Sequence, residues 1–473
     1  MSRELPKTTR PQNRQKPQML PIQRRAKTFE EVNLGFSEEQ ALSEASRCLQ
    51  CPKPYCMAGC PADVQIPKFI RALKDKDYRK AIEIIYETNS LPAITGRVCQ
   101  VESQCEKACV LNRSGNPIAI GALERFVADL ALREGWKAIK RGKLNGGKVA
   151  VVGSGPAGLT AAGDLIKFGY DVTVFEALHK VGGVLSYGIP DFRLPKDVVD
   201  KEVKTLTEAG VKIVTDVCVG RTLTIDELFK RGYDAVFIGI GTGVPAMLNI
   251  PGSNLNGIYT ANEFLVRAVL MRAYLFPSYN TPIKVGRKVV VIGGGNTAVD
   301  SARVALRLGA EEVQIIYRRR EEEMPARAEE IKNAKEEGVK IMPLVSPERF
   351  IGNESSEVTA VECVRNQPTY IDASGRSHPV PIEGSNFEVS ADTVIIAIGQ
   401  KANQLISQTT PDIRIDSDGY IVVDYNAMTS KPFVWAGGDI IRGSATVIQA
   451  IGDAKRAAAD IDRILRKRNI GER

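Results

Sequence analysis

The sequence predicts an α/β protein with a small, mostly helical N-terminal domain followed by two doubly wound units, the second inserted in the first. Seven of the nine cysteines lie before residue 110, in a segment whose apolar residues recur at helical spacing. A strand, a glycine-rich turn, a helix and a second strand then follow one another twice, beginning near residues 148 and 288. The C-terminal strands and helix carry no third copy, so we expect them to complete the first unit.

The composition is that of a globular protein with several domains. The chain has 473 residues, of which 43% are hydrophobic and 25% are charged, and this length is enough for two to four domains. No apolar run is long enough for a membrane helix, and the polar first twenty residues do not read as a secretory signal. We therefore expect a cytoplasmic protein that does not bind membranes.

Most of the formal net charge of +8 comes from the N-terminal residues 1–27, which contain eight Lys or Arg residues and one Glu. We predict a flexible, solvated basic arm for this segment, in preference to a strap that docks on an acidic partner or a nucleic acid. The rest of the chain is close to neutral, and we expect no nucleic-acid binding. With only two histidines, the sequence leaves little room for histidine-based catalysis.

Residues 28–140 read as the helical domain. The stretch "IPKFIRALKDKDYRKAIEIIYET" has apolar residues at helical spacing, and "AIGALERFVADLALREGW" closes the domain with another amphipathic helix. Between the helices stand the seven cysteines. A domain with so little regular core is expected to depend on a bound metal.

The cysteine spacing favours iron–sulfur clusters. The first run is C-x2-C-x4-C-x3-C-P over residues 48–61, and the second is C-x5-C-x3-C over residues 99–109. The first run is like the ferredoxin pattern C-x2-C-x2-C-x3-C-P, in which the last cysteine binds a different cluster from the other three. Zinc and disulfides are the alternatives; zinc sites show matched pairs or histidines, and disulfides suit secreted chains. Seven thiolates leave two four-iron clusters one ligand short.

The segment "KVAVVGSGPAGLTAAGDLIKFGYDVTVFE" carries the first nucleotide-binding fingerprint. Gly153, Gly155 and Gly158 occupy the three glycine positions between an apolar strand and a helix, and Glu176 ends the next strand, where a carboxylate can accept hydrogen bonds from a ribose. We expect nucleotide contacts at Gly153, Ser154, Gly155, Pro156, Ala157, Gly158 and Glu176. Further contacts are expected from "GTG" and "AGGD" at Gly241, Gly438, Asp439 and, at the start of the last helix, Thr446.

The second fingerprint, "KVVVIGGGNTAVDSARVALRLGAEEVQIIYRRR", differs at the end of its second strand. Arginines stand there in place of an acid, and guanidinium groups bind a 2′-phosphate that a carboxylate would repel. The fingerprint therefore predicts NADP(H), although an arginine cluster solvated beside the acidic residues 321–323 is the alternative. The expected contact residues are Gly293, Gly294, Gly295, Asn296, Thr297, Arg318 and Arg319.

An acid-ended site and an arginine-ended site in one chain predict FAD in the first and NADPH in the second, so that hydride passes between them. The predicted domains are Rossmann-like: 147–255 together with 388–473 for FAD, and 256–387 for NADP(H). A disulfide reductase would use similar domains, but it needs a redox cysteine pair beside the flavin. The remaining cysteines, Cys218 and Cys363, are solitary and are expected to be small buried residues.

The assembled motifs resemble the family of the NADPH-dependent glutamate synthase small subunit over residues 28–473. The chain is similarly close to the large subunit of NADH-dependent reduced-ferredoxin:NADP oxidoreductase, also called sulfide dehydrogenase, and to the N-terminal part of dihydropyrimidine dehydrogenase. The resemblance is carried by the cysteine spacing and by "IGALERF", "GSGPAGL", "GGVLSYGIPDFRLP", "GTG", "GGGNTAVD", "YRR" and "AGGD".

The resemblance implies two [4Fe-4S] clusters, and each cluster takes ligands from both cysteine runs. Cys48, Cys51, Cys56 and Cys109 would hold one cluster, whereas Cys60, Cys99, Cys105 and Glu124 would hold the other. A surface role for Glu124, paired with a neighbouring arginine, is the alternative. The resemblance also implies FAD contacts at Gly183 and Leu185 and a 2′-phosphate contact at Arg327.

The same resemblance implies an oxidoreductase that works as one subunit of an oligomer. As the electron-input subunit of glutamate synthase, the chain would pass electrons between NADPH, FAD, the clusters and a large subunit. The chain offers neither an N-terminal nucleophile for glutamine nor an FMN barrel, so a catalytic partner is expected. The alternative is the FAD subunit of an electron-bifurcating ferredoxin:NADP oxidoreductase, whose partner would be a small flavoprotein.

Overall fold

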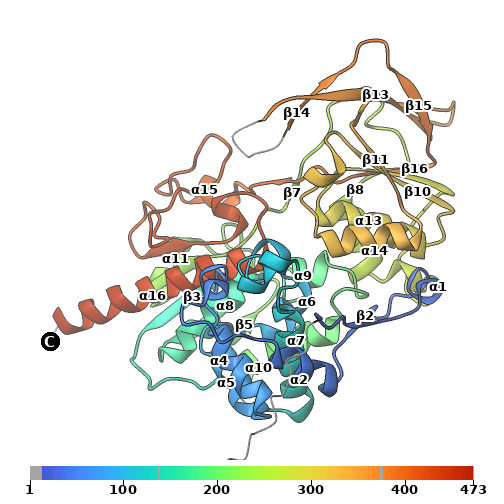
Figure 1. Ribbon diagram of the computed structural model, residues 1–473. Helices are drawn as coiled ribbons and strands as arrows, with labels where there is room; N and C mark the ends of the chain where they lie inside the picture. Colours follow the sequence, from blue (N-terminus) through green and yellow to red (C-terminus); the bar gives the residue numbers. More distant parts are fainter. Residues whose placement is uncertain (1–12, 137–138, 372–376, 472–473) are drawn as a thin grey trace, which may run out of the picture.

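The computed structural model describes residues 13–136, 139–371 and 377–471, and shows a helical domain below two sheet-containing domains (Figure 1). The helical domain begins with a capping box, in which Ser37 and Gln40 bond each other's backbone N–H at the start of α2. Among the described residues, no helix combines the length and apolar character that crossing a membrane requires. The elements of this domain are β1 (Gln18–Met19), α1 (Ile22–Arg25), β2 (Asn33–Gly35), α2 (Glu38–Ser46), α3 (Tyr55–Ala58), α4 (Ile66–Lys74), α5 (Tyr78–Tyr86), α6 (Pro92–Val98), η1 (Val101–Ser103), η2 (Val110–Ser114) and α7 (Ile120–Glu134).

The first Rossmann-like domain contains a five-stranded parallel sheet in the order β18-β6-β3-β4-β5. Its core strands are almost wholly apolar and buried, as expected for a sheet covered on both faces. The long C-terminal helix α16 packs against α8 (Figure 1). The elements are β3 (Lys148–Val152), α8 (Pro156–Lys167), β4 (Asp171–Phe175), α9 (Val184–Tyr187), α10 (Lys196–Glu208), β5 (Lys212–Val214), α11 (Ile225–Lys230), β6 (Ala235–Ile238), α15 (Leu405–Thr409), β18 (Val434–Ala436) and α16 (Val447–Gly471).

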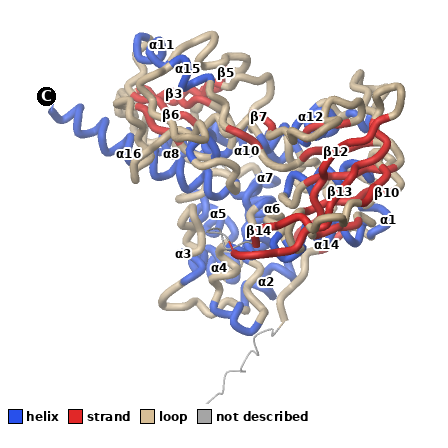
Figure 2. The backbone as a smooth tube through the Cα atoms, turned by 90° about the horizontal axis from the view of Figure 1, so that it is seen from above, coloured by secondary structure: helices blue, strands red, loops and turns tan. Residues whose placement is uncertain are grey.

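The second Rossmann-like domain is inserted between β6 and β18 of the first. It has a parallel sheet in the order β11-β10-β9-β16-β8, and an antiparallel layer of β12 to β15 lies beside it; Figure 2 shows β12 and β13 next to β10. The sequence reasoning did not anticipate this extra layer. The elements are β8 (Ile258–Thr260), α12 (Ala261–Leu265), β9 (Lys288–Ile292), α13 (Asn296–Arg307), β10 (Glu312–Tyr317), α14 (Ala328–Glu337), β11 (Lys340–Pro343), β12 (Val345–Gly352), β13 (Val358–Ile371), β14 (Ser377–Pro381), β15 (Phe387–Ser390) and β16 (Thr393–Ile396).

The sequence predicts that the chain returns to the first domain at residue 388, but in the structure this boundary lies later in the sequence. The strand β16 pairs in parallel with β9 and β8, so it belongs to the second sheet. The chain crosses between the domains at β7 (Val244–Pro245) and β17 (Gln400–Lys401), which pair antiparallel. An apolar strand such as "TVII" fits the interior of either parallel sheet, so its sequence alone could not decide between them.

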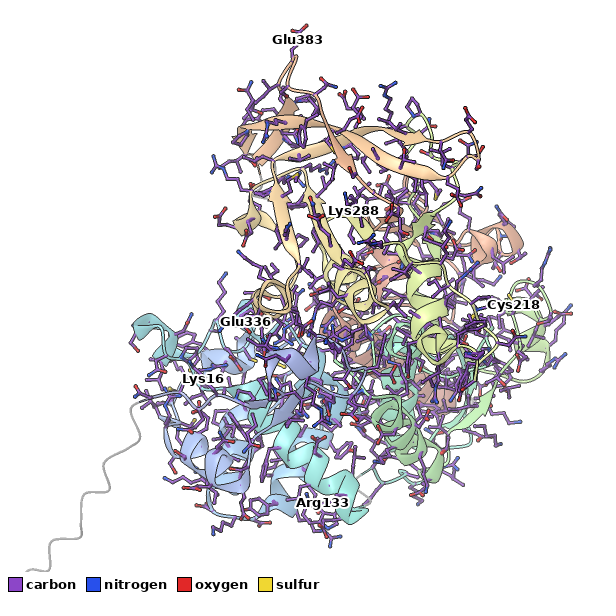
Figure 3. The ribbon with its side chains drawn as sticks, turned by 90° about the vertical axis from the view of Figure 1, so that its right-hand side faces the viewer. Lys16, Arg133, Cys218, Lys288, Glu336 and Glu383 are labelled. Atoms are coloured by element: carbon purple, nitrogen blue, oxygen red, sulfur yellow. The ribbon has the colours of Figure 1, made fainter. Side chains whose placement is uncertain are left out.

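The predicted flexible arm is ordered in its described part, although residues 1–12 lie outside the described residues. Arg14 forms a salt bridge of 2.6 Å with Glu106 of the helical domain. Arg25 is only 3% exposed, and it bonds Asn333 and Glu336 of the second Rossmann-like domain. Figure 3 shows Lys16 beside the helical domain and Glu336 at the boundary above it. Residues 13–35 therefore form a strap between two domains, because acids distant in sequence neutralise its arginines.

Candidate functional site

The four cysteines of the first predicted ligand set surround one cavity. Cys48, Cys51 and Cys56 come from the loop around α3, and Cys109 comes from the segment before α7. All four line the cavity, and its other walls are mainly apolar, including Ile66, Ile70, Leu111, Ile118 and Ile120. Four thiols in an apolar hollow are a donor set that suits an iron–sulfur cluster.

The remaining three cysteines form a second group around Glu124. The charge of Glu124 acts on Cys60, Cys99 and Cys105, and Cys60 also lies close to the other two thiols. Glu124 lies on α7 and is buried, which excludes a solvated surface role for it. Its Oε1 accepts hydrogen bonds of 2.7 Å from both Asn89 Nδ2 and Thr95 Oγ1.

Five thiols of the two groups lie in surroundings that oppose a free thiolate. Burial raises the pKa of Cys48, Cys60, Cys99 and Cys105, and it raises the pKa of Cys56 to about 12. Since a thiolate is the metal-binding form, a bound cation must supply the missing stabilisation. The residues present therefore fit metal clusters.

The two alternatives for the cysteines fit less well. All nine cysteines lie within the described residues, and each is a free thiol, so none is in a disulfide. Within the same residues, no three His, Cys, Asp or Glu side chains are close enough to hold a single metal ion. One zinc ion would need four ligands within about 2.3 Å of it. The described residues therefore offer no ready ligand set for a single zinc ion.

The first glycine fingerprint has the geometry of a phosphate cradle. Gly155 begins α8 without a side-chain cap, so the N–H groups of the first turn remain available for an anion. A Cβ at Gly158 would lie 1.9 Å from the carbonyl oxygen of Gly153, so the turn requires glycine there. Glu176 is buried and accepts a hydrogen bond of 2.9 Å from the Ser154 backbone N–H.

The other residues predicted for the first nucleotide lie around the same end of the sheet. Gly183 precedes the short helix α9 and lies against Gly155, while Leu185 is fully buried. A Cβ at Gly241 would point into open space, which leaves room for a ligand. Pro156 and Ala157 form the buried first turn of α8.

The start of α16 connects this site to the second cysteine group. Thr446 caps α16 by accepting a hydrogen bond of 3.3 Å from the Gln449 N–H, and its hydroxyl is 3.5 Å from the side chain of Gln104, next to Cys105. A Cβ at Gly452 would lie 2.8 Å from the carbonyl oxygen of Pro61, which follows Cys60. The second group therefore adjoins the first Rossmann-like domain.

Asp439 lies between "AGG" and this helix. Its Oδ1 accepts a hydrogen bond of 3.1 Å from the Ala445 N–H, and burial raises the pKa of its carboxyl to about 6. The neighbouring Gly438 N–H donates to Asp453 on α16. These bonds fix the turn that leads into α16.

The second fingerprint repeats the cradle at α13. Gly293 and Gly294 form the turn, Gly295 begins the helix without a side-chain cap, and the first turn contains Asn296 and Thr297. Asn296 Oδ1 accepts a hydrogen bond of 3.0 Å from the Arg327 backbone N–H. The loop before α14 is thereby fixed against this turn.

The three arginines predicted for the 2′-phosphate are in different surroundings. Arg318 is exposed at the end of β10. Arg319 is buried, and its Nε donates a hydrogen bond of 2.7 Å to the Ser377 carbonyl oxygen. Arg327 is also buried, and it donates to the Arg97 carbonyl oxygen at 2.9 Å and thus joins the second Rossmann-like domain to the helical domain. Of the three, Arg318 presents its side chain to the solvent.

The described residues outside the helical domain contain two free cysteines, Cys218 and Cys363, which lie in different domains and form no redox pair. Cys363 is buried in β13, and Cys218 is half-buried at the edge of the first domain, on the side away from Lys16 (Figure 3). The disulfide-reductase alternative therefore lacks its reacting groups among the described residues.

Two family models match the chain. Dihydropyrimidine dehydrogenase domain II, 4Fe-4S cluster, matches residues 25–136, and pyridine nucleotide-disulphide oxidoreductase matches residues 147–454. The glutamate synthase [NADPH] small chain of Escherichia coli is 36% identical over 452 residues, which cover 94% of this chain and 96% of that protein. Its counterpart in Azospirillum brasilense is 37% identical over 94% of this chain and 93% of that protein.

The chain belongs to the glutamate synthase small-chain family. It is an NADPH-dependent flavin and iron–sulfur oxidoreductase. Its cofactors are FAD, NADP(H) and iron–sulfur of the 4Fe-4S type. Its family includes proteins named as small chains or as a subunit, such as the NADP(+)-dependent formate dehydrogenase subunit beta of Moorella thermoacetica, which is 39% identical over 88% of this chain and 61% of that protein.

The solved structures agree with the fold of the two Rossmann-like domains. FprA of Mycobacterium tuberculosis in complex with NADPH superposes with a TM-score of 0.58 at 23% identity, covering 69% of this chain and 86% of that chain. At this identity the likeness shows the fold alone. The expectation of an α/β protein with a helical N-terminal domain is confirmed.

The sequence reasoning did not single out Asn89, Thr95 or Gln104, although the structure places them at the junctions described above. Asn89 and Thr95 stand in "NSLPAIT", where Pro92 begins α6, but the N-cap is Leu91 and Asn89 lies two residues earlier, so no capping signal marks either residue. Their contact with Glu124 depends on how α6 packs on α7, which no local pattern reports.

Proposed function

We propose that this chain is the electron-input subunit of a glutamate synthase-type complex, with two [4Fe-4S] clusters. When bound, FAD would supply hydride exchange with NADPH and single-electron exchange with the clusters, and the clusters would connect it with the partner subunit. The observation that carries the proposal is the division of the cysteines into two groups. One group surrounds the cavity at Cys48 and Cys109, and the other gathers around Glu124 beside α16.

Residues of the two Rossmann-like domains would bind the two nucleotides. The uncapped first turn of α8, with the carboxylate of Glu176 at the next strand end, would bind the pyrophosphate and ribose of FAD in the first domain. The first turn of α13 and the exposed Arg318 would bind NADPH in the second. We assign residues 13–35 to the strap, residues up to about 140 to the cluster domain, and the inserted NADP(H) domain to the segment between β7 and β17.

The ligand assignments follow the two groups. Cys48, Cys51, Cys56 and Cys109 would hold one cluster through four sulfurs. Cys60, Cys99 and Cys105 would hold the other, with Glu124 as the fourth ligand. Since Cys60 and Cys105 adjoin residues that contact α16, the second cluster would be the one nearer to FAD.

Anaerobic purification tests this proposal directly. We expect about eight iron atoms and one FAD per chain, as two four-iron clusters require, and faster bleaching of the flavin by NADPH than by NADH. A protein without iron and without flavin absorbance would contradict it. Purification from the native host identifies the partner: an amidotransferase-sized companion supports the glutamate synthase role, whereas a small flavoprotein would point instead to the bifurcating ferredoxin:NADP complex.

A further inference from the structure

Two side chains outside the predicted ligand sets hold Glu124 in place. Asn89 precedes α6 and Thr95 lies within it, and both are almost fully buried. Asn89 Nδ2 is 2.8 Å from Thr95 Oγ1 and 2.7 Å from Glu124 Oε1, and Thr95 Oγ1 is 2.7 Å from the same Oε1. The three polar groups form a closed triangle, in which both donors point at one oxygen of the carboxylate.

Further hydrogen bonds fix the orientations of the two donor side chains. Asn89 Oδ1 accepts a hydrogen bond of 3.0 Å from the Leu91 N–H, so its amide orientation is fixed with the NH₂ group towards Thr95 and Glu124. The Thr95 hydroxyl has one hydrogen, and the carboxylate at 2.7 Å is a nearer acceptor than the Leu91 carbonyl oxygen at 3.1 Å. A hydrogen bond to a charged acceptor is also the stronger one.

The helix α6 links this triangle to a cysteine of the same group. The Cys99 N–H donates a hydrogen bond of 3.0 Å to the Thr95 carbonyl oxygen, one helical turn away. Between them, Gly96 lets α6 approach α7 so closely that a Cβ there would lie 2.7 Å from the backbone nitrogen of Arg125, next to Glu124. The positions of Thr95, Cys99 and Glu124 are therefore set by one rigid contact.

We propose that Asn89 and Thr95 are positioning residues that hold Glu124 as a ligand of the second cluster and tune its reduction potential. This inference rests on the proposed function, because it needs the cluster around Cys60, Cys99 and Cys105. With Oε1 engaged by both donors, Oε2 is the oxygen left for iron. The two donors also withdraw negative charge from the ligand, which favours the more negative reduced cluster and raises its potential.

Threonine 95 offers the sharpest test. Thr95→Val removes the hydroxyl with little change of volume, whereas Thr95→Ser keeps it. The matched control is Thr88→Val, because the buried hydroxyl of Thr88 has no hydrogen-bond partner among the residues that the structure describes. The holoprotein variants would be purified without oxygen, assayed for iron, and titrated with dithionite while the signals of the clusters are followed by electron paramagnetic resonance.

We expect Thr95→Val to lower the midpoint potential of one cluster, or to lose the iron of that cluster, while Thr95→Ser and Thr88→Val resemble the wild type. The affected signal should be the one removed by Cys60→Ser and kept in Cys109→Ser. Unchanged potentials and iron content in Thr95→Val, equal effects of both Thr95 variants, or a change in the other cluster would overturn the inference. A wild-type protein without iron would instead refute the proposed function.

Discussion

A buried network of charges joins α13 and α14 of the second Rossmann-like domain and gives a quantitative prediction. The carboxylate of Glu337 on α14 accepts bonds of 2.9 and 2.6 Å from Arg303 and 2.8 Å from Arg307, both on α13. All three side chains are 0% exposed. Arg25 of the strap and Phe192 of the first domain also contact this network.

Glu337→Gln keeps the shape of the side chain but leaves two guanidinium groups partly uncompensated in the interior. Breaking a buried ion pair by removing one partner costs about 3 to 5 kcal/mol. The matched control is Glu311→Gln. Glu311 accepts two bonds of 2.8 and 2.7 Å from Arg287 with similar geometry, but both side chains are largely exposed. An exposed pair contributes about 0 to 1 kcal/mol.

Hydrogen exchange of the holoprotein measures this difference, because a chain of several domains does not unfold in two states. We expect the amides of α13 and α14 to exchange faster in Glu337→Gln, by a factor that corresponds to about 3 kcal/mol or more, and to be almost unchanged in Glu311→Gln. Equal protection in the two variants would refute the reasoning.

The pH dependence of the network follows from the same contacts. Burial alone would raise the pKa of Glu337, but the hydrogen bonds from Arg303 and Arg307 outweigh it, so the pKa lies below its usual range. A carboxyl with a lowered pKa stabilises the fold above the ordinary Glu pKa, and this contribution is lost as the pH falls through its folded pKa. The difference between wild type and Glu337→Gln should therefore shrink in acid.

Two further predictions concern the site, and a third concerns a buried carboxyl outside it. Arg318→Ala should raise the KM for NADPH about 10-fold or more, as expected for a lost charge-assisted bond of about 1.5 to 3 kcal/mol, and leave NADH turnover unchanged; an equal effect on both nucleotides would argue against a 2′-phosphate contact. Cys60→Ser and Glu124→Ala should damage the same cluster and Cys109→Ser the other, as paramagnetic resonance can distinguish; one signal lost in all three variants would contradict two separate ligand sets. Burial raises the pKa of Glu202 to about 8. The stability that its protonated carboxyl gives to the fold is therefore full below the unfolded pKa and is lost as the pH rises to about 8. Relative to wild type, Glu202→Gln should be more thermally stable at about pH 8.5 than at about pH 5.5, and a difference that does not change with pH would contradict this.

Much of the fold and of the nucleotide chemistry could be predicted from local sequence. Phosphate binding at a helix start needs glycines at fixed spacing after an apolar strand, and that requirement is met within a few residues at Gly153 and Gly293. Glu176 and Arg318 each lie a predictable number of residues after the glycines of their fingerprint, because the lengths of the intervening helix and strand are regular. The cysteine spacing likewise indicated a cluster domain.

Other features depended on packing between distant segments. The basic residues 13–27 read as a solvated arm, because the acids that neutralise Arg25 lie some three hundred positions later. The strand β16 could have joined either parallel sheet. Arg327 is buried against the helical domain, where it donates to the Arg97 carbonyl oxygen, and its predicted contact with the 2′-phosphate stays a prediction.

The chemical groups that this protein carries can be predicted from short stretches of sequence, because the function of the fingerprints and cysteine runs follows from spacing along one segment. How those groups are combined depends on the tertiary structure. The separation of Cys60 from Cys48, the burial of Glu124 against Asn89 and Thr95, and the contact between α16 and the cluster domain all arise where helices far apart in the chain meet. Hydrogen bonding and burial at such contacts depend on distance in space, which local patterns do not encode.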